Sequence, residues 1–182
     1  MGYQACDNNA MTNQILPAYE HLDRLGIPYR LLNFPEATEK GAANVANALG
    51  FRERQMVKTL IFETDAKEYA LVMLGGDQNA ISGHLKKALG SRNIKMAAPE
   101  TVLAVTGYVI GSIPPFHWQP EGFRSFLEES LMAEPELGVG AGKWGHEIII
   151  TPDNLIAACD AHVVNFTDKE LPIFRNTGEH LG

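Results

Sequence analysis

The sequence predicts an α/β fold with a single domain, in which helices surround a mixed, largely antiparallel β-sheet or a partly closed barrel. Segments with the composition of strands outnumber segments with helical spacing of apolar residues. Several neighbouring strand segments are separated by short polar stretches, as in hairpins. Of the 182 residues, 45% are hydrophobic and 20% are charged, which is enough for one core of ordinary size.

Helices are expected where apolar residues recur at helical spacing and a glycine or proline marks an end. The expected helices cover residues 14–25, with Asn13 as the N-cap, and residues 42–49, 81–89, 99–105 and 152–158. The expected strands cover residues 27–34, 56–62, 69–74, 94–97, 137–139, 147–151 and 162–166. Residues 124–128 fit either a strand or a helix by pattern alone. The strands at 56–62 and 69–74 are expected to form a hairpin.

Cysteine usage and hydropathy indicate a cytoplasmic protein without a membrane segment. Cys6 and Cys159 are the two cysteines, and they form neither a CxxC motif nor a ligand-spaced pair. No stretch reaches the roughly 18 apolar residues that a membrane span needs, and the start lacks the features of a signal peptide. Residues 1–12 are expected to be a flexible leader and residues 169–182 a polar tail. The domain itself is then expected to span residues 13–168.

Common motifs of cofactor, metal and serine chemistry are not met. Gly140, Gly142 and Gly145 match the GxGxxG spacing, but a strand is expected after them where dinucleotide binding needs a helix. The six histidines are scattered, and no His, Cys and carboxylate cluster has metal-ligand spacing. No GxSxG elbow is present. We therefore expect no cofactor and no metal.

The charge distribution leaves two interpretations of one basic stretch. A formal net charge of −7 argues against a protein that coats nucleic acid, because phosphate binding needs clustered Lys and Arg. Residues 78–98, however, contain no Asp or Glu. The basic residues of this stretch are Lys86, Lys87, Arg92 and Lys95. They form either a face that meets a phosphate backbone or an ordinary solvated helix face and turn.

Lys58 stands out because it shares one face of its expected strand with Leu60 and Phe62. One interpretation is that Lys58 lies at the end of the strand and extends its ammonium into water. The other is that the ammonium is held at a pocket wall, where it can act on a carbonyl or carboxylate.

Three segments resemble the YbaK/prolyl-tRNA-synthetase-associated domains, a family of editing modules that deacylate mischarged tRNA. Residues 55–61 (QMVKTLI) are similar to the lysine strand of that family. Residues 106–115 (TGYVIGSIPP) resemble its signature loop, a Gly followed four residues later by Pro, and residues 139–148 (VGAGKWGHEI) its third pocket-lining segment. The order of elements over residues 16–166 also agrees. The resemblance implies an antiparallel-rich α/β fold in which residues 124–128 form a strand.

The resemblance also implies the residues of the site. Glu147 stands where related deacylases carry Asp and would contact the aminoacyl group, and Gly140 stands where some relatives have Ser. The implied catalytic residues are Lys58, Gly111 and Pro115, and the substrate-binding residues are Glu147, Gly140, Gly142 and Thr59. The charge of the basic stretch, and not the resemblance, gives the expected tRNA-binding residues, which are Lys86, Lys87, Arg92 and Lys95.

The expected function is that of a free-standing trans-editing hydrolase that deacylates mischarged aminoacyl-tRNA, with tRNA(Pro) carrying a non-cognate amino acid as its substrate. The expected partners are the acceptor end of aminoacyl-tRNA and prolyl-tRNA synthetase. Phe116 and Trp118 either stack on the terminal adenine or belong to the core. The alternatives are a non-catalytic module that binds aminoacyl-tRNA or a synthetase, and a small-molecule esterase or amidase.

Overall fold

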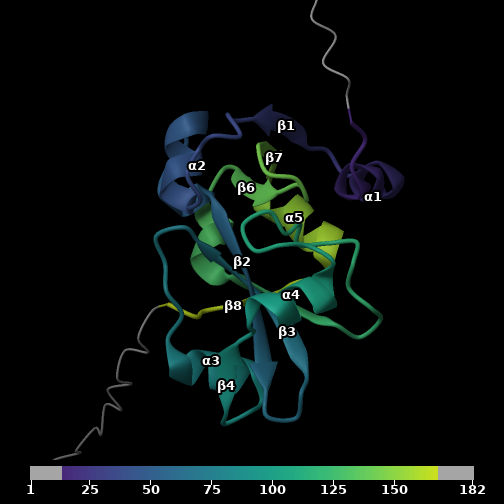
Figure 1. Cartoon of the computed structure of the whole chain (residues 1–182). Coiled ribbons are helices and arrows are strands. Elements are labelled where there is room, and N and C mark those ends of the chain that lie inside the picture. The colour runs from purple at the N-terminus through teal and green to yellow at the C-terminus, as the bar shows by residue number, and fades with distance from the viewer. Residues whose placement is uncertain (1–13, 168–182) are drawn as a thin grey trace, which may run out of the picture.

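Two β-sheets form the framework of the protein, whose computed structural model describes residues 14–167 (Figure 1). The three-stranded sheet is antiparallel, in the order β1 (Arg30–Asn33), β7 (His146–Ile150), β6 (Leu137–Gly140). The five-stranded sheet has the order β4 (Ile94–Met96), β2 (Val57–Thr64), β3 (Tyr69–Gly75), β5 (Arg124–Glu128), β8 (His162–Val164). Its first three strands are antiparallel, and β3, β5 and β8 are parallel. The predicted mixed sheet is confirmed, but the sheets do not close into a barrel.

The predicted hairpin is confirmed as β2 and β3, and residues 124–128 form a strand. The helices are α1 (Pro17–Leu25), α2 (Ala42–Leu49), α3 (Ser82–Leu89), α4 (Pro99–Thr106) and α5 (Pro152–Cys159), with 3-10 turns η1 (Glu53–Gln55) and η2 (Glu129–Ala133). The first helix begins at Pro17 and not at residue 14, since proline has no N–H to donate and its fixed φ suits the first turn. Asn13, the predicted N-cap, lies outside the described residues. No helix within residues 14–167 has the length and apolarity needed to cross a bilayer.

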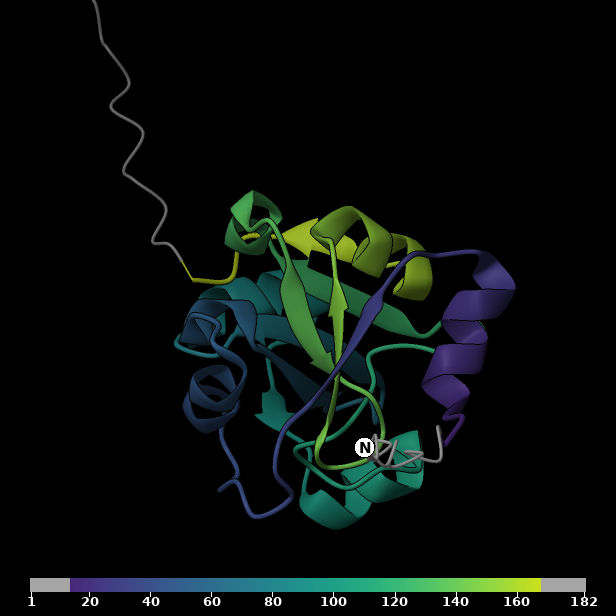
Figure 2. The same cartoon turned by 90° about the horizontal axis from the view of Figure 1, so that it is seen from above.

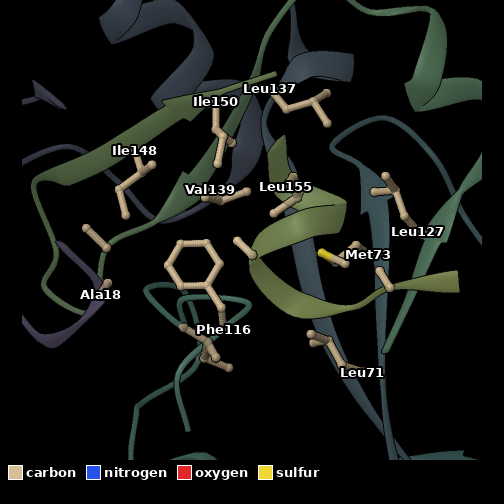
Figure 3. Packing of buried hydrophobic residues seen from close by; sticks show 14 of the residues in the cluster. Ala18, Leu71, Met73, Phe116, Leu127, Leu137, Val139, Ile148, Ile150 and Leu155 are labelled. Atoms are coloured by element: carbon tan, nitrogen blue, oxygen red, sulfur yellow. The ribbon is translucent and has the colours of Figure 1, made fainter. Parts of the chain in front are cut away.

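The main core lies between the two sheets and includes residues from α1, α5 and the loop after α4. Figure 3 shows Phe116 among side chains of the two sheets and of α5. Phe116 is fully buried and stacks on His21 with ring centroids 5.4 Å apart. Trp118 is half-buried, and its indole N–H donates to the Pro114 carbonyl at 2.6 Å. Phe116 therefore belongs to the core, and the hypothesis that it stacks on adenine is wrong.

The three-stranded sheet packs against helices on both of its faces. Alternate residues of β7 therefore belong to different hydrophobic clusters. Ile148 and Ile150 belong to the main core together with residues of α1 and α5. Ile149 belongs to a second cluster with residues of α2. Figure 2 shows α1 and α2 on opposite sides of this sheet. Since side chains alternate along a strand, Glu147 is on the face of Ile149, toward α2.

The two sheets approach each other at the beginning of β2. Met56, just before β2, forms a bridge with Gly138 of β6. The loop after α4 lies against the end of β6, where a Cβ at Gly140 would be 2.8 Å from the Ser112 carbonyl carbon and 3.1 Å from the Ile113 oxygen. At 2.8 Å, a Cβ atom would overlap the backbone of Ser112. The loop can therefore pack this closely on β6 only because residue 140 has no side chain.

We expect Gly140→Ala to destabilise the fold by about 1–3 kcal/mol, because the added methyl group meets backbone atoms that cannot swing away. Gly83→Ala is the matched control, since a Cβ at Gly83 in α3 would have nothing within 4 Å. That change should raise stability by about 0.4–1 kcal/mol. Urea unfolding of both variants measures the effects. A Gly140→Ala midpoint equal to that of the unmodified protein would contradict the described fit of loop and strand.

Candidate active site

A cavity of about 390 Å³ lies where β2 begins, α2 begins, and β6 and β7 meet the loop after α4. Five of the residues that the sequence analysis singled out line this cavity. They are Lys58, Thr59, Gly111, Gly140 and Glu147. They come from four separate parts of the chain, so the fold brings most of the predicted pocket together.

Lys58 is a half-buried cation in the wall of the cavity. It is the second residue of β2, where it pairs with Leu74 of β3. Its ammonium donates a hydrogen bond to the backbone carbonyl of Gln78. Burial lowers the pKa of the Lys58 ammonium, and the carboxylates of Glu53 and Asp77 offset part of this effect. Lys58 thus lies near the end of its strand, as one interpretation expects, and lines a pocket, as the other expects.

Glu147 is a buried acid in the same cavity. Only 8% of its surface is exposed, and burial raises the pKa of its carboxyl to about 8. No residue within 14–167 forms an ion pair or hydrogen bond with this carboxyl, so nothing in the described protein compensates its charge. The group is therefore protonated at neutral pH, and it can donate one hydrogen bond and accept another.

Gly111 lies at the mouth of the cavity with a left-handed φ of 106°. Glycine adopts this conformation without steric cost. A Cβ there would be 3.7 Å from Cδ of Lys40 and 3.9 Å from Cζ3 of Trp144. The Lys40 ammonium lies 3.4 Å from the Ile110 carbonyl, to which it donates, and the Trp144 indole donates to the Glu36 carbonyl at 3.1 Å. Lys40 and Trp144 flank the entrance to the pocket.

Lys40 and Trp144 are site residues that local sequence patterns do not reveal. Lys40 is an exposed residue in a polar loop, and no local pattern separates it from an ordinary surface lysine. Trp144 belongs to the third segment that carries the family resemblance, and this membership was the available signal. Their proximity to Gly111 depends on contacts between residues far apart in the chain.

Pro115 and Gly142 lie outside the cavity lining and shape the loop behind it. Pro115 is buried, and its carbonyl accepts a hydrogen bond from the Gln119 side chain at 2.7 Å. Gly142 has a φ of 96°, and its N–H donates to the Ser112 carbonyl at 2.8 Å. The structure thus gives both residues contacts that hold the segment next to Gly111. Their predicted direct roles stay predictions.

The four predicted tRNA-binding residues are all exposed but lie far from the cavity. Lys86 and Lys87 are on α3, Arg92 follows that helix, and Lys95 is on β4. The β4 strand pairs with the last three residues of β2, whereas the cavity lies at the beginning of β2. Figure 1 shows α3 and β4 at the end of the molecule opposite α2. A role in tRNA binding therefore requires a ligand long enough to contact both ends.

The cavity suits attack by water on a bound ester or amide. Its lining contains no Ser, Cys or His side chain, and Thr59 supplies its one hydroxyl. Cys159 lies elsewhere, its thiol donates to the Leu155 carbonyl, and burial raises the pKa of this thiol to about 12. Within residues 14–167 no three His, Cys, Asp or Glu side chains are grouped to hold a metal ion. The lining offers two lysine side chains, a neutral acid, one hydroxyl and backbone groups.

Comparison with known sequences places this chain in a family. Residues 36–158 match the model of the aminoacyl-tRNA editing domain. The chain is 27% identical over 162 residues to the multifunctional Ser/Thr-tRNA deacylase ProXp-y of Escherichia coli K12, covering 86% of this chain and 93% of that protein. It is 25% identical over 160 residues to EbsC of Enterococcus faecalis, a candidate Cys-tRNA(Pro)/Cys-tRNA(Cys) deacylase, covering 87% and 97% of the two chains.

Solved structures and a longer enzyme show the same relationship. A crystal structure of a candidate trans-editing enzyme for prolyl-tRNA synthetase superposes with a TM-score of 0.75 and 25% sequence identity, covering 84% of this chain and 96% of that one. A proline–tRNA ligase of Desulforamulus reducens is 30% identical over 131 residues, which are 72% of this chain and 20% of the ligase. The chain belongs to the family of aminoacyl-tRNA editing domains.

Proposed function

We propose that the protein is a trans-editing deacylase that hydrolyses the ester between an amino acid and the terminal ribose of tRNA. The observation that carries this proposal is the presence of Lys58, Glu147 and the Gly111 loop around one cavity. The names of ProXp-y and EbsC, which align over nearly their whole length, support the same chemistry. We propose tRNA(Pro) with a non-cognate amino acid as the substrate, and the cytoplasm as the place of action.

In this mechanism a water molecule attacks the carbonyl carbon of the ester. Negative charge develops on the carbonyl oxygen, and the Lys58 ammonium and N–H groups near Gly111 stabilise it. The bond between the carbonyl carbon and the ribose oxygen then breaks, and the proton released by the water passes to that ribose oxygen. A ribose hydroxyl of the substrate helps to activate the water, as the family resemblance implies. The products are the free amino acid and uncharged tRNA.

Glu147 contacts the aminoacyl group in this proposal. A protonated carboxyl in the cavity wall offers one donor and one acceptor, and a substrate group that satisfies neither leaves both unpaired. Amino acids of similar size are hard to separate by apolar contacts alone, which supply about 1–3 kcal/mol of discrimination. Glu147 is therefore the residue in the cavity best suited to separate polar from apolar amino acids.

Prolyl-tRNA synthetase is proposed as a partner because regions of proline–tRNA ligases are similar to this chain. In this proposal the deacylase contacts prolyl-tRNA synthetase because that enzyme is the source of the mischarged tRNA. The main alternative, a module that binds aminoacyl-tRNA without turnover, uses the same cavity. Turnover of purified protein on mischarged tRNA separates the two functions.

We expect Lys58→Ala to reduce the rate of deacylation by about 10²–10³-fold, because one preorganised electrostatic contact in the transition state is lost. Lys58→Met keeps much of the apolar packing of the side chain and should lose activity equally, with little change in stability. Lys58→Arg should also be poor, since a planar guanidinium cannot replace a compact ammonium. Single-turnover hydrolysis of mischarged tRNA and thermal unfolding measure the two effects. Near-normal rates in a well-folded Lys58→Ala variant would refute the mechanism.

We expect Glu147→Gln to be more stable than the unmodified protein by a margin that grows between about pH 5 and pH 8. The pKa of Glu147 is about 8 in the folded protein and 4.5 as the ordinary value, so across this interval the unfolded chain releases the proton and the folded chain keeps it. Stability then falls with rising pH by up to about 1.4 kcal/mol per pH unit, and glutamine does not titrate. Denaturant unfolding at both pH values checks this.

The same variant should reorder the preference among aminoacyl groups in competition assays. A stability difference that stays constant with pH would show that the carboxyl is not buried as a neutral acid. An unchanged preference profile would remove Glu147 from the contact with the amino acid.

We expect replacement of Lys86, Lys87, Arg92 and Lys95 by Ala to weaken tRNA binding while single-turnover rates at saturating tRNA change little. Each lost phosphate contact should reduce the slope of log affinity against log salt by about 0.7–0.9. Lys67→Ala is the control, because Lys67 is an exposed cation at the same end of the molecule and pairs with Glu63. Unaltered affinity and slope in the quadruple variant would show that tRNA docks on another face.

A further inference from the structure

A connected set of hydrogen bonds lies behind Lys58 and passes through Gln78, which the sequence analysis did not single out. The backbone carbonyl of Gln78 accepts the hydrogen bond from the Lys58 ammonium. The Gln78 side chain is buried, with 6% of the residue exposed, and both ends of its amide are used. Its oxygen accepts from the Gly75 N–H at 2.8 Å, and its nitrogen donates to the Ser130 hydroxyl at 2.8 Å. These two side-chain hydrogen bonds hold Gln78 from two sides, and they thereby fix the position of its backbone carbonyl.

Ser130 is in turn held by a buried carboxylate. The Ser130 N–H donates to Oε1 of Glu128 at 3.3 Å, and Glu128 is 1% exposed. The same carboxylate accepts hydrogen bonds from the Phe166 N–H at 2.7 Å and from the Thr167 hydroxyl at 3.0 Å. The hydrogen bonds therefore run from the cavity wall to the segment after β8. A buried acid with three donors around it is a stable point of attachment.

The turn that carries Gln78 has little freedom to move. A Cβ at Gly76 would be 2.5 Å from the Ala42 Cβ and 2.5 Å from the Glu53 carbonyl oxygen, so the turn fits against the beginning of α2 and against η1. Asp77 of the same turn also accepts from the Arg54 guanidinium of η1, with 2.5 Å between Oδ1 and Nε. The carbonyl that receives the Lys58 ammonium is therefore part of a rigid wall.

We propose that Gln78 is a positioning residue for Lys58. Lysine has a long flexible side chain, and its ammonium carries three donors. One donor is spent on the Gln78 carbonyl, which fixes the ammonium at the cavity wall and leaves two donors for the substrate. Ser130 and Glu128 keep that carbonyl in place. This inference rests on the proposed deacylation for its kinetic consequence, but the hydrogen bond itself can be observed without any substrate.

The kinetic test compares four variants in single-turnover deacylation. Gln78→Met keeps the shape of the side chain and removes both amide contacts, and Ser130→Ala removes one of them. Ser130→Thr retains the hydroxyl and serves as the conservative rescue. Ser125→Ala is the matched control, because the Ser125 hydroxyl is buried and has no partner among the described residues. These changes separate the loss of a specific hydrogen bond from the general loss of a buried polar group.

Gln78→Met and Ser130→Ala should lower the maximal rate by about 10- to 100-fold, because a displacement of about 1 Å in a catalytic group can cost that much. The substrate concentration at half-maximal rate should stay within about twofold, since the lost contribution acts in the transition state. Ser130→Thr and Ser125→Ala should keep nearly full rates. If Gln78 and Ser130 had a purely structural role, the two variants would lose stability, but the maximal rate would not fall while the half-saturating substrate concentration stayed constant.

The second measurement follows the Lys58 ammonium by ¹⁵N NMR in the protein without substrate. Its signal is assigned by its disappearance in Lys58→Met and should show slow hydrogen exchange in the unmodified protein. Faster exchange is expected in Gln78→Met and Ser130→Ala. Unchanged exchange in both variants, or unchanged rates despite faster exchange, would overturn the positioning role. Should no mischarged tRNA be hydrolysed, the proposed function fails, while the ammonium signal still decides whether Gln78 holds Lys58.

Discussion

The contact between the loop after α4 and the end of β6 is the constraint on which the site depends. Gly140 lets the backbone of Ser112 and Ile113 lie directly on the strand, and the Gly142 N–H secures the loop through the Ser112 carbonyl. Gly111, which precedes these residues, is thereby placed over the cavity. A loop seated by backbone contacts is more precisely placed than one held by exposed side chains, and this suits a segment whose N–H groups are proposed to act on a reacting ester.

Lys58 and Glu147, two of the ionisable groups in the cavity lining, have surroundings that favour their neutral forms. Burial lowers the pKa of Lys58 and raises that of Glu147, and the two side chains form no ion pair with each other. Desolvation is costly unless a ligand or a partner repays it. In the described protein, Lys58 has a partner in the Gln78 carbonyl, whereas Glu147 has none. The unpaired, buried Glu147 therefore lowers the stability of the fold, which is consistent with its proposed contact with a substrate.

Local patterns were enough to predict most elements and the face of Lys58. The hairpin of β2 and β3 follows from two strand segments around a polar stretch, and both ends of α2 follow from the glycines that flank it. The roles of Phe116, Lys40 and Gln78 could not be predicted in this way. Each depends on residues far apart in the chain, namely the packing between sheets, the position of the segment before α2 beside Gly111, and the hydrogen bond from β2 to the turn after β3. The basic stretch was recognised as such, but its distance from the cavity follows from the pairing of β4 with β2.

The fit at Gly140 also bears on how selectivity can diverge within the family. The resemblance places serine at this position in some relatives, and in this chain even a first side-chain carbon would meet the backbone of Ser112. In this chain, a serine at position 140 would therefore require a different path of the neighbouring loop. Exchanging this one residue would change the strand and the loop together, so its effect on the cavity depends on the loop sequence that accompanies it.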